Sequence, residues 1–358
     1  MLGRSASLPR TSPTSGTSGR TSPTFSAVSS RCQNCLPTTW RVCSSHGENG
    51  VDHLIPVVLD TDIGTDIDDT WALAMLLNSP ELHLLAVVTS HGDARYRALL
   101  AAKFLESVGR EDVSVGEGVA DGLLPAGRRG QQAWLAGYVS ADYDGPYRTD
   151  GAQLLIDTVM ASPEPVCVLC IGPASTTAAA LAMAPEIAVK ARFVGMHGAV
   201  RRGYGGSPNP VPEYNVLADV AAFRSVLAAP WSVTLTPLDT CGIVTLDGDE
   251  YAAVRDANTA PMRSVMANYR AWAKSIGHPE LAEQRSTALF DTVAVYLAFA
   301  DDLLDMETIR LAVRDDGLTF ESADGRPVNA AMGWRDLPAF RRLLIDRLAI
   351  ESKRSIGP

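Results

Sequence analysis

Residues 55–69 read IPVVLDTDIGTDIDD, and this stretch passes directly from an apolar run into five aspartates within eleven positions. A short apolar run of this kind is typical of a buried strand. Carboxylates held a few ångströms apart cannot all stay ionised unless a cation or shared protons neutralise them. The stretch therefore indicates a metal ion or a shared proton at the end of a strand, unless the acids simply lie on the surface.

The chain beyond this stretch alternates short apolar strands with longer helical segments. Apolar strands are predicted within LHLLAVVTS, VSVG, EPVCVLCIG, ARFVGM and WSVTLTPL. Such strands, joined by helical crossovers, predict an α/β fold with a Rossmann-like core, in which a mostly parallel central sheet has helices on both faces. Further helices are predicted near 218–228, at 259–276 and at 286–299. The chain end predicts a hairpin at TIRLAVRDDGLTFE and a helix near 335–350.

Length and composition predict a single folded domain, residues 51–358, that follows a tail, residues 1–50. The chain has 358 residues, of which 46% are hydrophobic, enough to bury a large core. The tail is rich in Ser, Thr, Pro and Arg and has no acidic residue before Glu48, so we expect it to be disordered. Its composition suits an organelle transit peptide, and a dispensable tail explains it equally well.

Charge and hydropathy argue against several classes of partner. The net charge of −10 disfavours nucleic-acid binding, which requires a basic face. No apolar run approaches the ~20 residues of a membrane span, so we expect a soluble protein. Three tail cysteines near a histidine lack the framework of a zinc site (Cys32, Cys35, Cys43 and His46). The remaining cysteines indicate core thiols of a reducing, cytoplasmic compartment (Cys167, Cys170 and Cys241).

Polar residues stand directly after four of the predicted strands: in chain order, Asp60 and Asp62, His91 and Asp93, Ser175, and His197. The carboxyl ends of parallel strands share one edge of the sheet, and ligands bind beyond that edge. We therefore expect the working face of the protein to lie there.

Two interpretations of the aspartate cluster compete. Acids at a helix start meet free N–H groups and the positive end of the helix dipole, so some of them could be caps. Five acids exceed what capping uses, and carboxylates without neighbouring Cys or His suit Ca²⁺ or Mg²⁺. The spacing is not that of an EF-hand. Asp291 is the candidate for a further ligand, since a charge would be costly in its otherwise apolar helix, although a solvated orientation is the alternative.

Four segments in the correct order resemble the inosine/uridine-type nucleoside hydrolases. DTDIGTDIDD is similar to the aspartate signature of that family, with two extra residues. IGPASTTAAALAMAP resembles its Gly-Pro-Leu-Thr-Asn turn, GMHGAVRRGYGGSPNPVPEYNVLADVAA its Met-Gly-Gly … Glu-Phe-Asn segment, and LFDTVAVYLA its His-Asp-x-x-Ala helix. The resemblance covers roughly residues 55–350 and implies a nucleoside hydrolase fold and a glycosidase activity.

The resemblance implies a role for each matching residue. Asp62 and Asp69 would ligate a calcium ion, completed by Asp291 and the backbone carbonyl of Ser175. The ion would hold a water and lower its pKa, and Asp62 would take the proton as the water attacks the anomeric carbon of a ribose. The transition state should resemble an oxocarbenium ion.

The resemblance also implies residues that bind the sugar. Asp68, Glu213 and Asn215 match residues that contact ribose hydroxyls, and Asp93 stands where the family has an asparagine. Plain helix capping is the alternative for the PEYN segment. The implied partner is a small nucleoside or other N-riboside, and family members are usually dimers or tetramers.

The main departure from the family affects the leaving group. The histidine that protonates the departing base in many members is Phe290 in this chain. Three histidines are candidate replacements, and a structural role is the alternative for each: His91, His197 and His278. Tyr269 and Trp272 could stack on a base, although their helical spacing favours core packing.

Two other interpretations remain. DTDIGT fits the opening of haloacid-dehalogenase-like phosphatases, but neither Lys103 nor Lys190 stands at a strand end as that mechanism requires. A non-catalytic protein on the same fold would tolerate the loss of Asp62. We expect a calcium-dependent N-ribosyl hydrolase.

Overall fold

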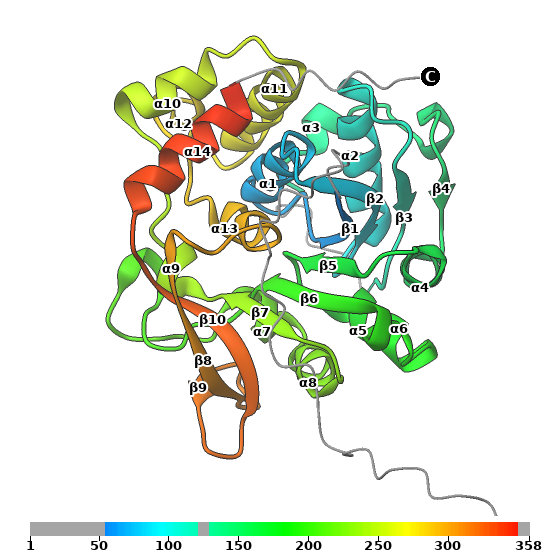
Figure 1. Ribbon diagram of the computed structural model, residues 1–358. Helices are drawn as coiled ribbons and strands as arrows, with labels where there is room; N and C mark the ends of the chain where they lie inside the picture. The colour runs from blue at the N-terminus through cyan, green and yellow to red at the C-terminus, as the bar shows by residue number, and fades with distance from the viewer. Residues whose placement is uncertain (1–53, 121–128, 350–358) are drawn as a thin grey trace, which may run out of the picture. The chain divides into compact units, whose positions relative to one another are not determined.

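The computed structural model describes residues 54–120 and 129–349, all of which belong to a compact unit that spans Ser44–Pro358 (Figure 1). The predicted tail, its disorder and its cysteines lie outside the described residues. The predicted domain boundary at residue 50 therefore stays a prediction.

The described residues form a ten-stranded sheet with the strand order β4-β3-β2-β1-β5-β6-β7-β10-β8-β9. Every neighbouring pair from β4 to β10 is parallel, and β8 is antiparallel to both of its neighbours. This confirms the mostly parallel sheet. The strands are β1 Ile55–Thr61, β2 Leu82–Thr89, β3 Ser114–Gly116, β4 Tyr147–Arg148, β5 Val166–Cys170, β6 Ala191–Met196, β7 Val233–Thr236, β8 Leu304–Val313, β9 Thr319–Glu321 and β10 Arg326–Trp334.

Helices cover both faces of the sheet, as the sequence predicts (Figure 1). Val57 and Leu59 of β1 belong to one apolar cluster, shared with α1, α2, α11 and α13, whereas Val58 belongs to a second, shared with α4, α5 and α8. The α-helices are α1 Asp68–Leu77, α2 Ala94–Ser107, α3 Gln132–Leu135, α4 Gly151–Ala161, α5 Ser175–Met183, α6 Ile187–Lys190, α7 Tyr214–Ala218, α8 Val220–Ala228, α9 Leu238–Cys241, α10 Gly248–Arg255, α11 Ala260–Ser275, α12 Leu281–Gln284, α13 Phe290–Leu297 and α14 Leu337–Ala349. Two 3₁₀ turns are η2 Ser140–Asp142 and η3 Tyr204–Gly206.

The strand register brings the predicted polar residues to one edge. Asp60 of β1 lies opposite Val88 of β2 and Cys170 of β5, so these three neighbouring strands end at the same level. β6 follows β5 in the sheet, in parallel. The loops after β1, β2, β5 and β6 are therefore adjacent, as expected for a ligand-binding edge.

The C-terminal part confirms the predicted hairpin and final helix. β8 and β9 form the hairpin, β10 returns along the other side of β8, and α14 closes the described chain.

The helix predicted at 286–299 is shorter than expected, since α13 begins only at Phe290. Leu289 precedes α13 with a non-helical backbone (φ −102°, ψ 60°), and the backbone N–H groups of Ser286 and Leu289 donate to the carbonyls of Leu246 and Val244 at 3.0 and 2.8 Å, which ties this segment to the loop after α9. Asp291 consequently lies in the first turn of α13, where the helix dipole favours a carboxylate.

Two compositional predictions can be compared with the described part of the chain. Cys167 and Cys170 are buried free thiols in the two opposite apolar clusters, and Cys241 is also a buried free thiol. Among the described helices, none has both the length and the apolar character needed to cross a membrane.

Candidate active site

The loop between β1 and α1 buries most of its acids. The N-cap residue of α1 is Ile67, whose side chain cannot form a capping hydrogen bond. Asp68 and Asp69 lie in the first turn of the helix and are not its N-cap. The Thr61 hydroxyl donates to Asp69 and accepts from the backbone N–H of Ile63 at 3.1 Å. Capping therefore does not account for the cluster.

Four carboxyl groups share this buried environment: Asp62, Asp68, Asp69 and Asp291 are 6%, 4%, 2% and 3% exposed. Burial raises the pKa of Asp62 to about 6. Burial and the neighbouring carboxylates raise the pKa values of the other three well above the ordinary range. The carboxyl oxygens of Asp66, Asp68 and Asp69 lie within 4.8 Å of one another. Carboxylate oxygens that are buried together without enough positive charge around them fit a hard divalent cation.

The turn between β5 and α5 borders Asp62. A Cβ atom added at Gly172 would lie 2.8 Å from Oδ1 of Asp62 and 2.7 Å from its backbone nitrogen, so only glycine lets the two segments approach this closely. Ser175 begins α5, and its hydroxyl donates to Asp219 at 2.7 Å. Asp219 in turn caps α8 through the N–H of Ala222. The Ser175 hydroxyl thus has a structural partner, and the role of its backbone carbonyl stays a prediction.

Asp60 ties three elements together beneath the site. It accepts from the Ser90 hydroxyl at 2.6 Å and from the hydroxyl and N–H of Thr177 at 2.7 and 3.1 Å. Burial raises the pKa of Asp60 to about 6, while these hydrogen bonds favour the charged form. Asp60 therefore joins the ends of β1 and β2 to α5.

Arg97 of α2 is a site residue that the sequence reasoning missed. Its side chain is fully buried, and it donates to the carbonyl of His91 at 2.7 Å, the carbonyl of Ile63 at 3.1 Å and the hydroxyl of Thr65 at 3.0 Å. A guanidinium nitrogen lies 4.0 Å from the carboxylate of Asp62. The sequence pattern that could have indicated Arg97 is its position, as a charged residue, on the apolar face of the helix that becomes α2.

Three other side chains hold the two extra residues of the signature and the glycine before them. The indole of Trp272 donates to the carbonyl of Thr65 at 3.1 Å, and Gln131 donates to the carbonyl of Asp66 at 2.5 Å. The hydroxyl of Tyr96 lies 3.3 Å from the carbonyl of Gly64. Trp272 and Tyr269 are buried, as their spacing favoured.

The predicted sugar-binding residues already have protein partners. Glu213 caps α7 and accepts from the N–H groups of Gly198 at 2.9 Å, Asn215 at 2.7 Å and Val216 at 3.2 Å. Burial raises the pKa of Glu213 to about 7. The amide of Asn215 donates to two carbonyls, at the ends of β5 and β6, each at 3.1 Å. The capping role considered for the PEYN segment is therefore present, since Glu213 caps α7. The bonds of Asn215 to the ends of β5 and β6 place this segment at the carboxyl edge of the sheet.

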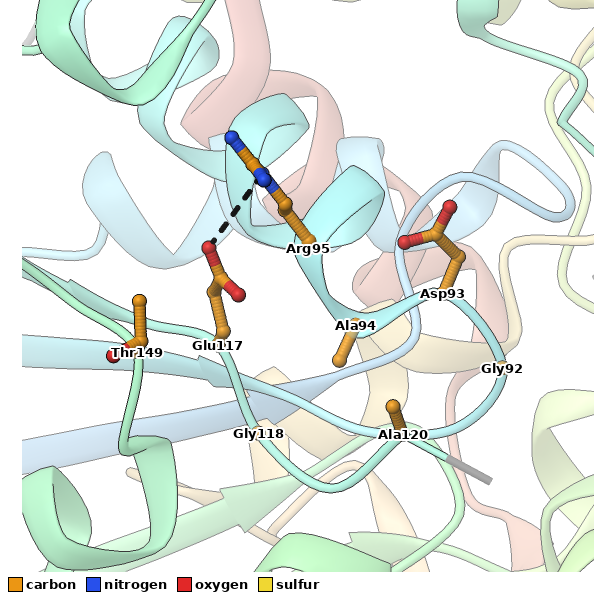
Figure 2. Close-up of a pocket in the computed structure, with 8 residues that line it drawn as sticks. All are labelled: Gly92, Asp93, Ala94, Arg95, Glu117, Gly118, Ala120 and Thr149. Carbon is orange, nitrogen blue, oxygen red and sulfur yellow. Dashed lines mark ion pairs between the residues drawn. The ribbon is translucent and has the colours of Figure 1, made fainter. Parts of the chain in front are cut away.

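Asp93 has protein partners outside the acid cluster. It caps α2 through the N–H of Tyr96 at 3.0 Å and pairs with Arg129. Figure 2 shows that it lines a pocket with Arg95 and Glu117, which lie 3.9 Å apart. None of the predicted metal ligands lines this pocket, so it is a neighbour of the acid cluster rather than its entrance.

The three histidines occupy different environments. His91 lies close enough to Asp62 for its charge to lower the pKa of that acid, and its Nε2 is 3.2 Å from the hydroxyl of Tyr214. His197 is fully buried and stacks on Phe223 with ring centroids 4.6 Å apart, and burial lowers its pKa to about 3. His278 is 67% exposed and lies 3.2 Å from Glu280. The structure thus brings only His91 of these three to the acid cluster.

Aromatic side chains stand beside the acids. Phe290 directly precedes Asp291, and Tyr204 meets its ring edge-on with centroids 5.9 Å apart. The hydroxyl of Tyr204 accepts from the N–H of Tyr214 at 3.1 Å. Burial, with the charges of Glu213 and Asp66, raises the pKa of Tyr204.

The two lysines of the phosphatase interpretation lie elsewhere. The Lys103 ammonium donates to the carbonyl of Trp134 at 2.6 Å, and the Lys190 ammonium donates to that of Met160 at 2.7 Å. Neither of them pairs with an acid of the cluster in the described structure.

A parallel α/β sheet that gathers buried carboxylates at its carboxyl edge places the ligand site at that edge and is typical of an enzyme that acts on a small molecule. The family described as inosine-uridine preferring nucleoside hydrolase matches residues 57–338. The chain belongs to this family, which confirms the resemblance, and it is a nucleoside hydrolase.

Curated relatives and solved structures agree with this assignment. The non-specific ribonucleoside hydrolase RihC of Shigella boydii serotype 18 is 25% identical over 316 residues, and RihC of Escherichia coli strain SMS-3-5 / SECEC is 26% identical over 316 residues. Both matches cover 83% of this chain and 99% of the relative. The plant nucleoside hydrolase PpNRh1 has a TM-score of 0.70 at 22% identity, over 83% of this chain and 99% of its own. An inosine-guanosine nucleoside hydrolase has a TM-score of 0.66 at 18% identity, with the same coverage. These structural likenesses concern the fold.

Proposed function

We propose that the chain is a calcium-dependent N-ribosyl hydrolase that cleaves a small N-riboside into ribose and a free base. The observation that carries this proposal is the convergence of buried Asp62, Asp69 and Asp291 beside the β5–α5 turn. Family membership supplies the reaction type. The choice of calcium rests on the oxygen-only donors, which include the carbonyl of Ser175 in this proposal.

Each residue has a defined task in this proposal. Asp62, Asp69, Asp291 and the backbone carbonyl of Ser175 would hold the cation, which would supply a bound water of lowered pKa. Asp62 would act as the general base that takes a proton from the attacking water. Asp68, Glu213 and Asn215 hold the ribose hydroxyls, and the surrounding carboxylates stabilise positive charge on the ribose ring. Arg97 keeps the acid loop in place.

The sugar side and the base side of the site differ in chemistry. His91 reaches the site through Tyr214, which stands between Glu213 and Asn215, so we assign His91 to the sugar side. Phe290 and Tyr204 are assigned to the base side, where they would pack against an aromatic ring. Asp93 borders the site and has a supporting role through Arg129.

The experiment that tests this proposal measures ribose released from a panel of nucleosides and from p-nitrophenyl riboside, with calcium and after chelation. Nitrophenolate leaves without an acid, so this substrate reports the acid cluster alone. Cleavage that requires calcium supports the proposal. No cleavage of any riboside would favour a non-catalytic protein on the same fold.

A further inference from the structure

The two-residue expansion of the signature places an additional carboxylate beside the base side. Asp66 is exposed, whereas Asp68 and Asp69 are buried, and the carboxyl oxygens of the three lie within 4.8 Å. Gln131, which is itself fully buried, holds the carbonyl of Asp66. The backbone is therefore fixed from outside the cluster while the Asp66 carboxylate stays accessible to a ligand.

The two aromatic residues of the base side, Phe290 and Tyr204, offer no effective proton donor. Phe290 has no titratable group, and Tyr204 meets it edge-on at 5.9 Å and is 44% exposed. Burial raises the pKa of the Tyr204 phenol, and the charges of Glu213 and Asp66 add to this shift. A phenol with a raised pKa is a weaker acid. A neutral base, which departs with an additional electron pair, needs a proton from such a donor.

Among the residues that the structure describes, Arg97, Arg201 and Arg202 all bond to groups other than the Asp66 carboxylate. Arg97 is fully buried and bonded to three loop oxygens. Arg201 pairs with Glu307 and Glu321, and Arg202 bonds to the carbonyl of Gly206 at 3.4 Å. One divalent cation and Arg97 carry less positive charge than the carboxyl groups around them can carry negative charge. The site therefore favours a ligand that brings positive charge of its own.

We infer that the preferred substrate is an N-riboside whose base is a cationic aromatic ring, joined to the ribose through a pyridinium- or N7-alkylpurinium-type system, with Asp66, Phe290 and Tyr204 as the residues that select it. The inference rests on the proposed function and names its substrate class. The bond from the anomeric carbon to the ring nitrogen breaks with its electron pair on nitrogen, so the cationic base departs neutral and needs no proton. Water adds to the anomeric carbon, and its proton passes to Asp62. Carboxylate attraction and cation–π contact with Phe290 and Tyr204 both favour a positive ring.

The test compares matched ribosides. We would measure kcat/KM for 7-methylguanosine and guanosine, which differ by one methyl group and one positive charge, for nicotinamide riboside, and for neutral p-nitrophenyl riboside. The wild type, Asp66→Asn and a control, Asp144→Asn, would be compared, since Asp144 is exposed and lies elsewhere. The glycosidic bond to a cationic base breaks more easily than the bond to a neutral base, whether or not Asp66 is present. A loss of kcat/KM that appears only in Asp66→Asn therefore reports recognition of the cation by Asp66.

We expect both cationic ribosides to be cleaved with kcat/KM about a hundredfold above guanosine. Asp66→Asn should lower their kcat/KM about tenfold and leave p-nitrophenyl riboside within about threefold. Added salt should raise KM for the cationic substrates of the wild type. Equal losses on all substrates in Asp66→Asn, or equal cleavage of guanosine and 7-methylguanosine, would overturn the inference and leave the hydrolase proposal intact. No cleavage even of p-nitrophenyl riboside would overturn both.

Discussion

At the scale of single residues, one buried arginine bonds to the loop that carries the aspartates. Arg97 bonds to three oxygens of two loops and lies 4.0 Å from Asp62. Loss of one partner from a buried charged network is costly, because the other charge is left unpaired.

Arg97→Met should therefore lower the free energy of unfolding by about 3 kcal/mol. Arg95→Met, on the same helix, is the matched control, since Arg95 is 64% exposed and 3.9 Å from Glu117. It should cost less than about 1 kcal/mol. Urea denaturation of both variants makes the comparison, and equal losses would contradict the anchoring role.

Glu213 gives a pH-dependent prediction. Its pKa in the folded protein is raised from 4.5 to about 7, so the folded state holds the proton more tightly than the unfolded chain. The stability from this group is fully present below pH 4.5 and is lost as the pH rises through about 7. In the metal-free wild type, Glu213 should make the free energy of unfolding about 2 kcal/mol larger at pH 5 than at pH 8. This contribution should be absent from metal-free Glu213→Gln. Parallel pH profiles of the two proteins would show that Glu213 is not the group responsible.

The sequence allowed the aspartates to be predicted as a cluster, because their spacing is visible in IPVVLDTDIGTDIDD itself. The partners of individual side chains could not be predicted in the same way. Asp60 accepts hydrogen bonds from Ser90 and Thr177, and His197 stacks on Phe223 in the second apolar cluster. These contacts join segments that are distant in sequence, so no local pattern predicts them. The ligand roles of Asp62, Asp69, Ser175 and Asp291 remain predictions.

At the scale of elements, the first turn of α13 holds two residues of the proposed site at adjacent positions. Phe290 faces Tyr204, and Asp291 joins the buried acids. The late start of the helix creates this arrangement. The hydrophobic pattern alone could not predict that start, because it carries no information about the non-helical backbone of Leu289 or the hydrogen bonds that tie this segment to the loop after α9.

Phe290→His should supply the base side with a proton donor. We expect kcat/KM for neutral nucleosides to rise about tenfold or more, with p-nitrophenyl riboside little changed. Phe290→Leu is the control for lost aromatic packing. If the histidine and leucine variants show the same ratio of the two activities, proton donation does not limit the cleavage of neutral nucleosides.

At the scale of the whole molecule, the parallel sheet and its helical layers were predictable because near-continuous apolar strands alternate with helices along the chain. The full strand order was not. Placement of β10 between β7 and β8 depends on long-range pairing, which no local pattern encodes.

The acid cluster should make global stability depend on calcium, since a bound cation relieves repulsion between segments from both ends of the described chain. At a calcium concentration of 100 times Kd, the folded state should gain about 2.7 kcal/mol. This corresponds to a rise of about 5 °C in Tm. Scanning calorimetry with calcium and with chelator measures the shift. Asp291→Asn should remove most of it and Asp144→Asn none, so an unchanged shift in Asp291→Asn would place the cation elsewhere.

The most direct test of the central claim is the rate at which Asp62→Asn cleaves p-nitrophenyl riboside in saturating calcium. The leaving group needs no acid, so the rate reports only the water, its base and the sugar site. We predict a folded variant, by circular dichroism, whose kcat is lower by a factor of about 10³ or more. A folded Asp62→Asn protein with undiminished kcat would contradict the mechanism.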